Sequence, residues 1–166
     1  TTTADSNGAF SFTPSSAFSA GSHSITATAT DAFGNLSSPS SALSVNILTS
    51  RSDLKTAVDA WISNESSATA TYGDINTWNV SQITDFSSLF YEKSSFNSDI
   101  SNWDVSNGTN FSNIFQHAHK FNQNISSWDV SNGTNLSDMF HAAKSFNQDL
   151  SSWDVSNGTN FSNMFR

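Results

Sequence analysis

The sequence has 166 residues and a formal net charge of −8, with six lysines and arginines against 14 acidic residues, so it lacks the basic patches that nucleic acid or anionic lipid requires. Hydrophobic residues make up 36% of the chain and include 14 phenylalanines, enough for a folded core, whereas the lack of cysteine excludes disulfides and thiolate metal sites. The sequence shows no signal-peptide pattern and no apolar run of membrane-spanning length, so no membrane insertion is expected within it.

Residues 1–48 alternate polar and apolar side chains in the manner of β-strands. Apolar residues take every second position in three stretches, at Phe10 and Phe12, at Ile25, Ala27 and Ala29, and at Leu43, Val45 and Ile47. This alternation between glycine-containing turns predicts three or four antiparallel strands of a sandwich.

The segment GAFSFTPSSAFSAGSHSITATATDAFGNLSSPSSALSVNI resembles the second half of the bacterial immunoglobulin-like repeats of large surface adhesins. The turn positions that carry the resemblance are Gly21, His23, Asp31, Gly34 and Asn35. It implies an all-β immunoglobulin-like sandwich, which needs about seven strands. Residues 1–48 supply part of one: either its first strands lie outside the sequence, or a strand from elsewhere completes it.

Residues 49–74 change from strand to helix patterning. Ser52 and Asp53 offer an N-cap, and apolar residues follow at helical spacing, namely Leu54, Ala57, Val58, Trp61 and Ile62. The pattern predicts an amphipathic helix over residues 52–64. Because a stack of repeats must cover the apolar end of its first unit, residues 49–74 are predicted to be a helical N-terminal cap.

Residues 75–166 repeat every 25 residues, with three full units and a fourth begun. The tryptophans of the four units are Trp78, Trp103, Trp128 and Trp153, and valine, phenylalanine and asparagine recur at fixed distances from them. Such strict self-similarity is the signature of a stacked repeat architecture. The four tryptophans, together with Phe115 and Phe140, are predicted to form its core.

Each repeat is predicted to contain a short strand and a short helix. Ile100, Trp103 and Val105 are spaced like the inward positions of a leucine-rich-repeat strand. After the Asn107-Gly108 turn, Thr109 or Asn110 can cap a helix whose apolar face is Phe111, Ile114, Phe115 and Ala118.

The runs YGDINTWNVSQITDFSSLF, FNSDISNWDVSN and FNQDLSSWDVSN resemble the BspA-like leucine-rich-repeat surface proteins, which include mycoplasmal lipoproteins. The resemblance covers residues 50–166 and implies a non-catalytic extracellular interaction module. One departure recurs, because Gly108, Gly133 and Gly158 stand where the family has an apolar residue; we expect a looser turn and a lost core contact there. The predicted fold class is mixed: a partial all-β immunoglobulin-like sandwich followed by an α/β leucine-rich-repeat-like solenoid.

Outward positions of the predicted strands are the candidate partner-binding residues: Asn102, Asp104, Ser106, Asp129, Ser131, Asp154 and Ser156. Aspartates in register on neighbouring strands repel one another unless a cation or a basic partner screens them. The row could therefore bind calcium, a cationic partner or a sugar. The alternative is that these positions need only a polar residue, since a flat row lacks the converging geometry of a calcium cage.

Three further groups have structural alternatives. Asp74, Asp99 and Asp149, with Asn124 in the same column, are predicted to cap turns. Asp31 and Asn35 could bind calcium, or they could hold their own turn by side-chain hydrogen bonds. Apart from this calcium, no cofactor is expected.

The third group is His117, His119 and His141, which lack a recognisable zinc spacing and are predicted to lie on a solvated loop face. No catalytic motif appears, so the chain is not expected to be an enzyme.

These observations predict a bacterial cell-surface or secreted adhesion module that displays a polar strand face. Its partner would be a protein or glycan on another surface, or a copy of itself. The alternative is a structural subunit of an extracellular filament or surface layer, assembled through the open ends of the chain. A stalk that extends another domain from the cell is a third hypothesis.

Overall fold

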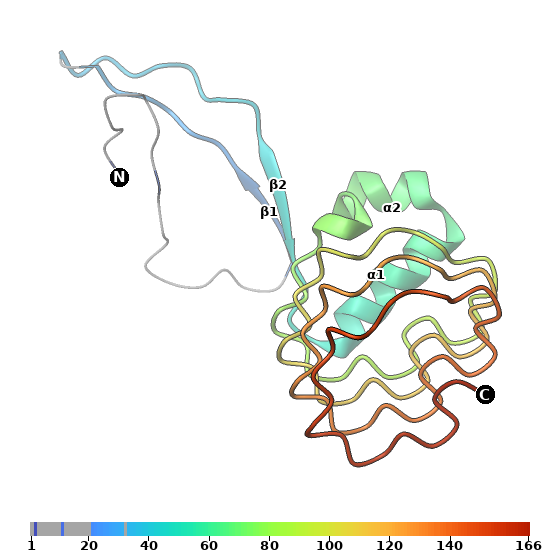
Figure 1. The fold of residues 1–166 in the computed structure, drawn as a ribbon. Coiled ribbons are helices and arrows are strands. Elements are labelled where there is room, and N and C mark those ends of the chain that lie inside the picture. The colour runs from blue at the N-terminus through green and yellow to red at the C-terminus, as the bar shows by residue number, and fades with distance from the viewer. Residues whose placement is uncertain (1, 3–10, 12–20, 32) are drawn as a thin grey trace.

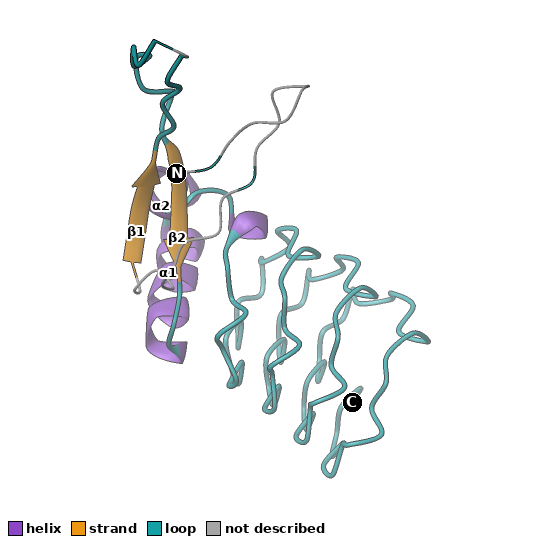
Figure 2. Ribbon diagram, turned by 90° about the vertical axis from the view of Figure 1, so that its left-hand side faces the viewer, coloured by secondary structure: helices purple, strands orange, loops and turns teal. Residues whose placement is uncertain are grey.

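The computed structural model of the chain describes residues 2, 11, 21–31 and 33–166. In chain order its elements are β1 (Gly21–Ile25), β2 (Leu43–Ile47), α1 (Arg51–Ser63), α2 (Glu65–Tyr72) and a single 3-10 turn, η1 (Ile75–Thr77). The strands and helices lie at one end of a series of coils formed by residues 78–166 (Figures 1 and 2).

The described N-terminal residues from 21 to 47 form one hairpin. β1 and β2 pair antiparallel, with Gly21 opposite Ile47 and Ile25 opposite Leu43. β2 matches the strand predicted around Val45, whereas the alternation at Ala27 and Ala29 lies beyond the end of β1. The strand predicted around residues 10–12 lies outside the described residues.

The predicted immunoglobulin-like sandwich is wrong for the described residues. A sandwich packs two sheets face to face, but β1 and β2 form one two-stranded sheet. Among the described residues of this region there is no second sheet to cover the apolar side chains, and Phe33 is 92% exposed and Leu36 68% exposed.

Helix α1 covers the end of the first repeat. Its N-cap is Ser50, whose Oγ accepts from the Asp53 N–H at 3.1 Å, two residues before the cap that the sequence suggested. Its buried face, Leu54, Ala57, Val58 and Trp61, belongs to the same apolar cluster as the repeats. The Trp61 ring meets Trp78 edge-on at 5.9 Å, and its Nε1 donates to Ser98 Oγ at 3.0 Å.

The second helix, α2, was not predicted. Its serine, threonine and alanine residues carry almost no apolar stripe, and only Ala68 is buried. The signals that could have found it lie at its ends. Asn64 accepts from the Ser67 N–H, and Gly73 ends the helix with a φ of 76°, which a glycine adopts without steric cost.

The repeats stack on one another, and one side of each is joined to the next by backbone hydrogen bonds. We call this the backbone-linked side; it comprises residues 85–92, 110–117, 135–142 and 160–166. Along it, alternate N–H groups donate to the carbonyl 24 residues on, as from Phe111 to Asn135 at 2.8 Å and from Phe115 to Met139 at 3.0 Å. Parallel bridges join Asn110 to Asn135 and Asn135 to Asn160.

The side-chain-linked side comprises residues 74–82, 99–107, 124–132 and 149–157, and side chains make its inter-repeat bonds. The indole Nε1 of Trp103 donates to the Ile75 carbonyl at 2.7 Å, and Trp128 and Trp153 make the same bond to the preceding repeat. Asn107 Nδ2 donates to the Ser81 carbonyl at 2.8 Å, a bond also repeated in later units.

Columns of aromatic rings fill the interior. Phe90, Phe115 and Phe140 stack at centroid distances of 5.5 and 5.6 Å, and Trp103 lies 6.4 Å from Trp128 with the rings nearly parallel. Such pairs contribute about 0.5–1.5 kcal/mol beyond their buried area. The predicted core residues Trp78, Trp103, Trp128, Phe115 and Phe140 are buried, and Trp153 is half-buried against them.

The predicted α/β leucine-rich-repeat-like solenoid is wrong, because residues 78–166 contain neither a helix nor a strand beyond isolated bridges. Where the helix was expected, alternate N–H groups bond to the next repeat instead of to the fourth residue before them. Left-handed backbone recurs there at two positions per repeat, for example φ of 59° at Asn113 and 60° at His117. Where the strand was expected, the chain forms successive turns.

The lost core contact expected at the recurring glycines was also wrong, whereas the looser turn expected there stays a prediction. A Cβ on Gly108 would lie 2.3 Å from the Phe111 ring and 2.9 Å from the Val105 carbonyl. The Phe111 ring therefore occupies the space that a side chain would take, and the glycine is buried without a lost core contact.

Candidate binding face

An exposed row of carboxylates runs along the side-chain-linked side. We call Asp104, Asp129 and Asp154 the aspartate row; Asn79 holds the same place in the first repeat. All four are exposed. The row does not lie on a strand, as the sequence had predicted, but at the start of one tight turn in each repeat.

The same hydrogen bonds fix each aspartate of the row. Asp104 Oδ1 accepts from the Ser106 N–H at 3.1 Å and from the Ser106 hydroxyl at 2.6 Å. Asp129 and Asp154 accept from the N–H groups of Ser131 and Ser156 at 3.0 and 2.9 Å. In Asp104 both bonds run to Oδ1, so its Oδ2 is directed to neither turn donor.

The turn bonds also favour the charged forms of Asp129 and Asp154. Hydrogen bonds from the Ser131 hydroxyl and N–H lower the pKa of Asp129 below its ordinary value of 3.8, against an opposing effect of the neighbouring Asp154 charge. The N–H and hydroxyl of Ser156 lower the pKa of Asp154 in the same way. The mutual repulsion that the sequence suggested is therefore present, but the turns outweigh it.

The other predicted binding residues flank the row. Asn102 is exposed, and its N–H donates to Asn76 Oδ1 at 2.9 Å. Ser106 and Ser131 are half-buried, and Ser156 is exposed. All seven predicted residues thus lie on one side of the stack, although the serines act mainly as donors within their turns.

The second acidic column caps turns, as predicted. Asp99 Oδ1 accepts from the Ser101 N–H at 2.9 Å, and the same bond is made in the other repeats. A third column, which the sequence analysis missed, does the same on the backbone-linked side, where Asn110 accepts from Ser112. The signal was available: an aspartate or asparagine stands two residues before a serine three times in every full repeat.

The Asp31 turn uses both oxygens of its carboxylate. Oδ1 accepts from the N–H groups of Phe33 and Asn35 at 2.8 and 2.9 Å, and Oδ2 accepts from Asn35 Nδ2 at 2.9 Å. The Asn35 side chain and N–H are the main reasons that the pKa of Asp31 is lowered. This is the self-held turn that the sequence left open, and calcium binding by Asp31 and Asn35 stays a prediction.

No group of three or more histidines, aspartates or glutamates within the described ranges is arranged to hold a metal ion. Nor does any helix in this part of the chain have the length and apolar character needed to cross a membrane.

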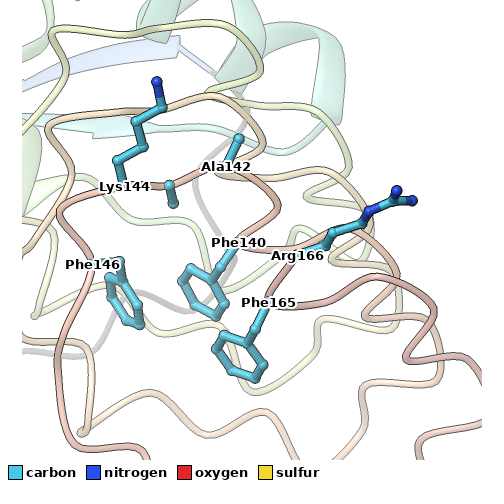
Figure 3. Close-up of a pocket in the computed structure, with 7 residues that line it drawn as sticks. Phe140, Ala142, Lys144, Phe146, Phe165 and Arg166 are labelled. Atoms are coloured by element: carbon cyan, nitrogen blue, oxygen red, sulfur yellow. The ribbon is translucent and has the colours of Figure 1, made fainter.

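A hollow of about 300 Å³ lies beside the last repeat, lined by Phe140, Ala142, Ala143, Lys144, Phe146, Phe165 and Arg166. The Phe140, Phe146 and Phe165 rings face one another, while the charged ends of Lys144 and Arg166 point away (Figure 3). None of the binding residues predicted from the sequence lines it.

Comparison with known families assigns most of the chain. The family described as "Mycoplasma protein of unknown function, DUF285" matches residues 56–166. The chain belongs to the DUF285 family. The DUF285 match includes α2, all the repeats and the aspartate row, whereas a bacterial Ig-like domain matches residues 1–49, which include β1, β2 and the Asp31 turn.

The two matches together support a bacterial surface protein of unknown function. The more specific leucine-rich-repeat type suggested by the BspA-like resemblance is not supported by them. No curated protein and no solved structure matches the chain.

Proposed function

We propose that the chain is a non-catalytic adhesion module of a bacterial surface or secreted protein, and that its aspartate row contacts a protein or glycan on another surface. The observation that carries the proposal is the repetition of one exposed carboxylate per repeat, each held by the same turn. A partner with amines or hydroxyls at a matching spacing would meet fixed acceptors and would not have to order them.

The surroundings of the row favour recognition over a purely structural role. One oxygen of each carboxylate makes the turn, which an asparagine does equally well, since Asn79 Oδ1 accepts from the Ser81 N–H and hydroxyl at 3.1 and 2.7 Å. The negative charge is therefore not required by the fold, yet three successive repeats carry it despite the repulsion between neighbours.

The test separates charge from fold. Asp104→Asn, Asp129→Asn and Asp154→Asn combined removes three charges while keeping every Oδ1 acceptor. The full chain and this variant would be screened on an array of glycans and purified surface proteins. We expect the variant to lose the binding that the wild-type chain shows, while its melting temperature falls only slightly because every Oδ1 acceptor is kept.

The matched control is Asp74→Asn, Asp99→Asn and Asp149→Asn combined. It removes the same number of charges from the neighbouring column, where Asn124 already makes the turn bond to Ser126 at 3.0 Å. Equal loss of binding in both variants would point to net charge alone, and full binding by the first variant would overturn the proposal.

A further inference from the structure

Two histidines from successive repeats lie side by side on the backbone-linked side. The ring centroids of His117 and His141 are 5.5 Å apart, and the ring planes are tilted by 43°. The His117 N–H donates to the His141 carbonyl at 2.9 Å, so the stacking of the repeats itself holds the two residues together. Both side chains are partly exposed and can be reached from solvent.

Asp138 orients one of the rings. Its Oδ1 lies 2.9 Å from His141 Nδ1, and because a carboxylate accepts, Nδ1 carries the proton of the neutral ring. The lone pair of His141 is then on Nε2. A carboxylate behind a histidine is the usual outer partner of a metal ligand, where it fixes the tautomer and raises the basicity of the ligating nitrogen.

We propose that His117 and His141 together bind one divalent first-row transition-metal ion, with Cu²⁺ bound most tightly. An ion about 2.0–2.1 Å from one nitrogen of each ring stands about 3 Å from each ring centre, so two such rings have centres about 5–6 Å apart. The separation of 5.5 Å meets this requirement. Imidazole suits copper, nickel and zinc, and the order of affinities places Cu²⁺ first.

The site has two protein ligands, and water completes the coordination. It is thus smaller than a cluster of three or more ligands, which the described residues do not form. His119 is the nearest further histidine, with its ring centre 6.0 Å from that of His117. Among the described residues no carboxylate orients its ring as Asp138 orients that of His141, so His141 is the better partner for His117. The site lies apart from the aspartate row and does not depend on the adhesion proposed for it.

The experiment titrates the full untagged chain with Cu²⁺ alone, followed by calorimetry and electron paramagnetic resonance. We expect one bound ion whose spectrum shows two imidazole nitrogens. Asp138→Asn should weaken binding roughly 10-fold to 100-fold, the usual cost of an outer partner. His117→Ala and His141→Ala should each cost at least as much and leave a one-nitrogen spectrum.

His119→Ala and His23→Ala are the matched controls, and both should keep the wild-type affinity and spectrum. Circular dichroism in EDTA checks that every variant is folded. Two results would overturn the proposal: a wild-type spectrum without two imidazole nitrogens, or a loss in His119→Ala equal to that in His141→Ala, which would place the ion on the His117 and His119 pair.

Discussion

The backbone-linked and side-chain-linked sides of a repeat differ in how strictly their sequences recur. On the side-chain-linked side, DISNWDVSN, NISSWDVSN and DLSSWDVSN of the later repeats are nearly identical, and DINTWNVSQ of the first repeat keeps the tryptophan, the valine and the following serine. Tryptophan, asparagine and serine side chains themselves make the bonds between repeats there. On the backbone-linked side, FSSLFYEK, FSNIFQHA and LSDMFHAA share the apolar positions and a serine, while the polar positions vary. Main-chain bonds are made whatever the side chain, so this side leaves positions free for new chemistry.

The largest expected effect comes from a matched pair of core substitutions, one on each side of the repeat. Trp103→Phe removes the indole donor and leaves the buried Ile75 carbonyl with only the longer bond from the Trp78 N–H at 3.3 Å. We expect a loss of about 2–4 kcal/mol in the free energy of unfolding from the lost bond and the smaller ring together. Phe111→Leu should cost about 1 kcal/mol, because its backbone bond remains and Leu136 already fills that column. Urea unfolding measures both, and equal losses would contradict the distinction.

A smaller pair tests the polar links. Asn132→Ala removes the bond from Nδ2 to the Ser106 carbonyl at 2.8 Å and should cost about 0.5–1.5 kcal/mol. Gln116→His on the backbone-linked side introduces the residue found 25 positions later, at His141, and should change stability by no more than about 0.5 kcal/mol. Thermal unfolding of the two variants in one buffer compares them, and a costlier Gln116→His would argue against a tolerant backbone-linked side.

The sequence predicted which residues lie inside, but not the backbone that carries them. The period of 25 placed the tryptophan and phenylalanine columns inward, since identical side chains one repeat apart must stack. The spacing of Phe111, Ile114, Phe115 and Ala118 suits a helix, yet it also suits consecutive turns, because three residues return the chain to the same face in both. Periodicity therefore cannot distinguish a helix from consecutive turns. The aspartate or asparagine that recurs two residues before a serine could have indicated the turns.

The aspartate row was located correctly on the surface but assigned to the wrong backbone. Alternation of Trp103, Asp104 and Val105 gives inward and outward positions in a turn as it does in a strand. The partnership of His117 with His141 could not be derived from the sequence, because they are 24 residues apart and not 25. It arises from the offset of the main-chain bond that joins them.

Left-handed positions on the backbone-linked side allow a stabilising change. Ala142 has a φ of 55°, which costs a residue with a Cβ about 1–2 kcal/mol. Ala142→Gly removes that cost but adds conformational entropy to the unfolded chain, so a net gain of about 0.5–1 kcal/mol is expected. Ala118→Gly, at a buried position without positive φ, should lose stability instead. Chemical unfolding measures the change in the free energy of unfolding for both variants. A change of the same sign in both would refute the argument.

The smallest effect is a pH dependence of the side-chain-linked side. The turn serines lower the pKa values of three carboxylates below 3.8, namely Asp129, Asp149 and Asp154. Because the folded carboxylates bind protons less readily than the unfolded ones, they stabilise the fold above about pH 4 and lose this contribution as the pH falls through their folded pKa values. The urea midpoint should therefore fall between about pH 5 and pH 2.5.

The control for this pH dependence is a variant in which the three aspartates are replaced by asparagine. The urea midpoint of this variant should fall less between about pH 5 and pH 2.5 than that of the wild-type chain. An identical fall in both proteins would assign the acid sensitivity to other carboxylates, such as Asp59. Burial raises the pKa of Asp59, but the hydrogen bonds and charges of Lys55 and Lys93 lower it by more, so the net shift is downward.

The direction of the bonds between repeats has an electrical consequence. On the backbone-linked side alternate N–H groups point toward the following repeat, as from His117 to His141. The indole of Trp103, the amide of Asn107 and the N–H of Asn110 point toward the preceding repeat. The two sets of bond dipoles therefore oppose each other along the axis of the stack. An α-helix accumulates a macrodipole as its peptide units align, but here each added unit brings bonds of both directions, so the potential at either end grows less than it would if all the bonds were aligned.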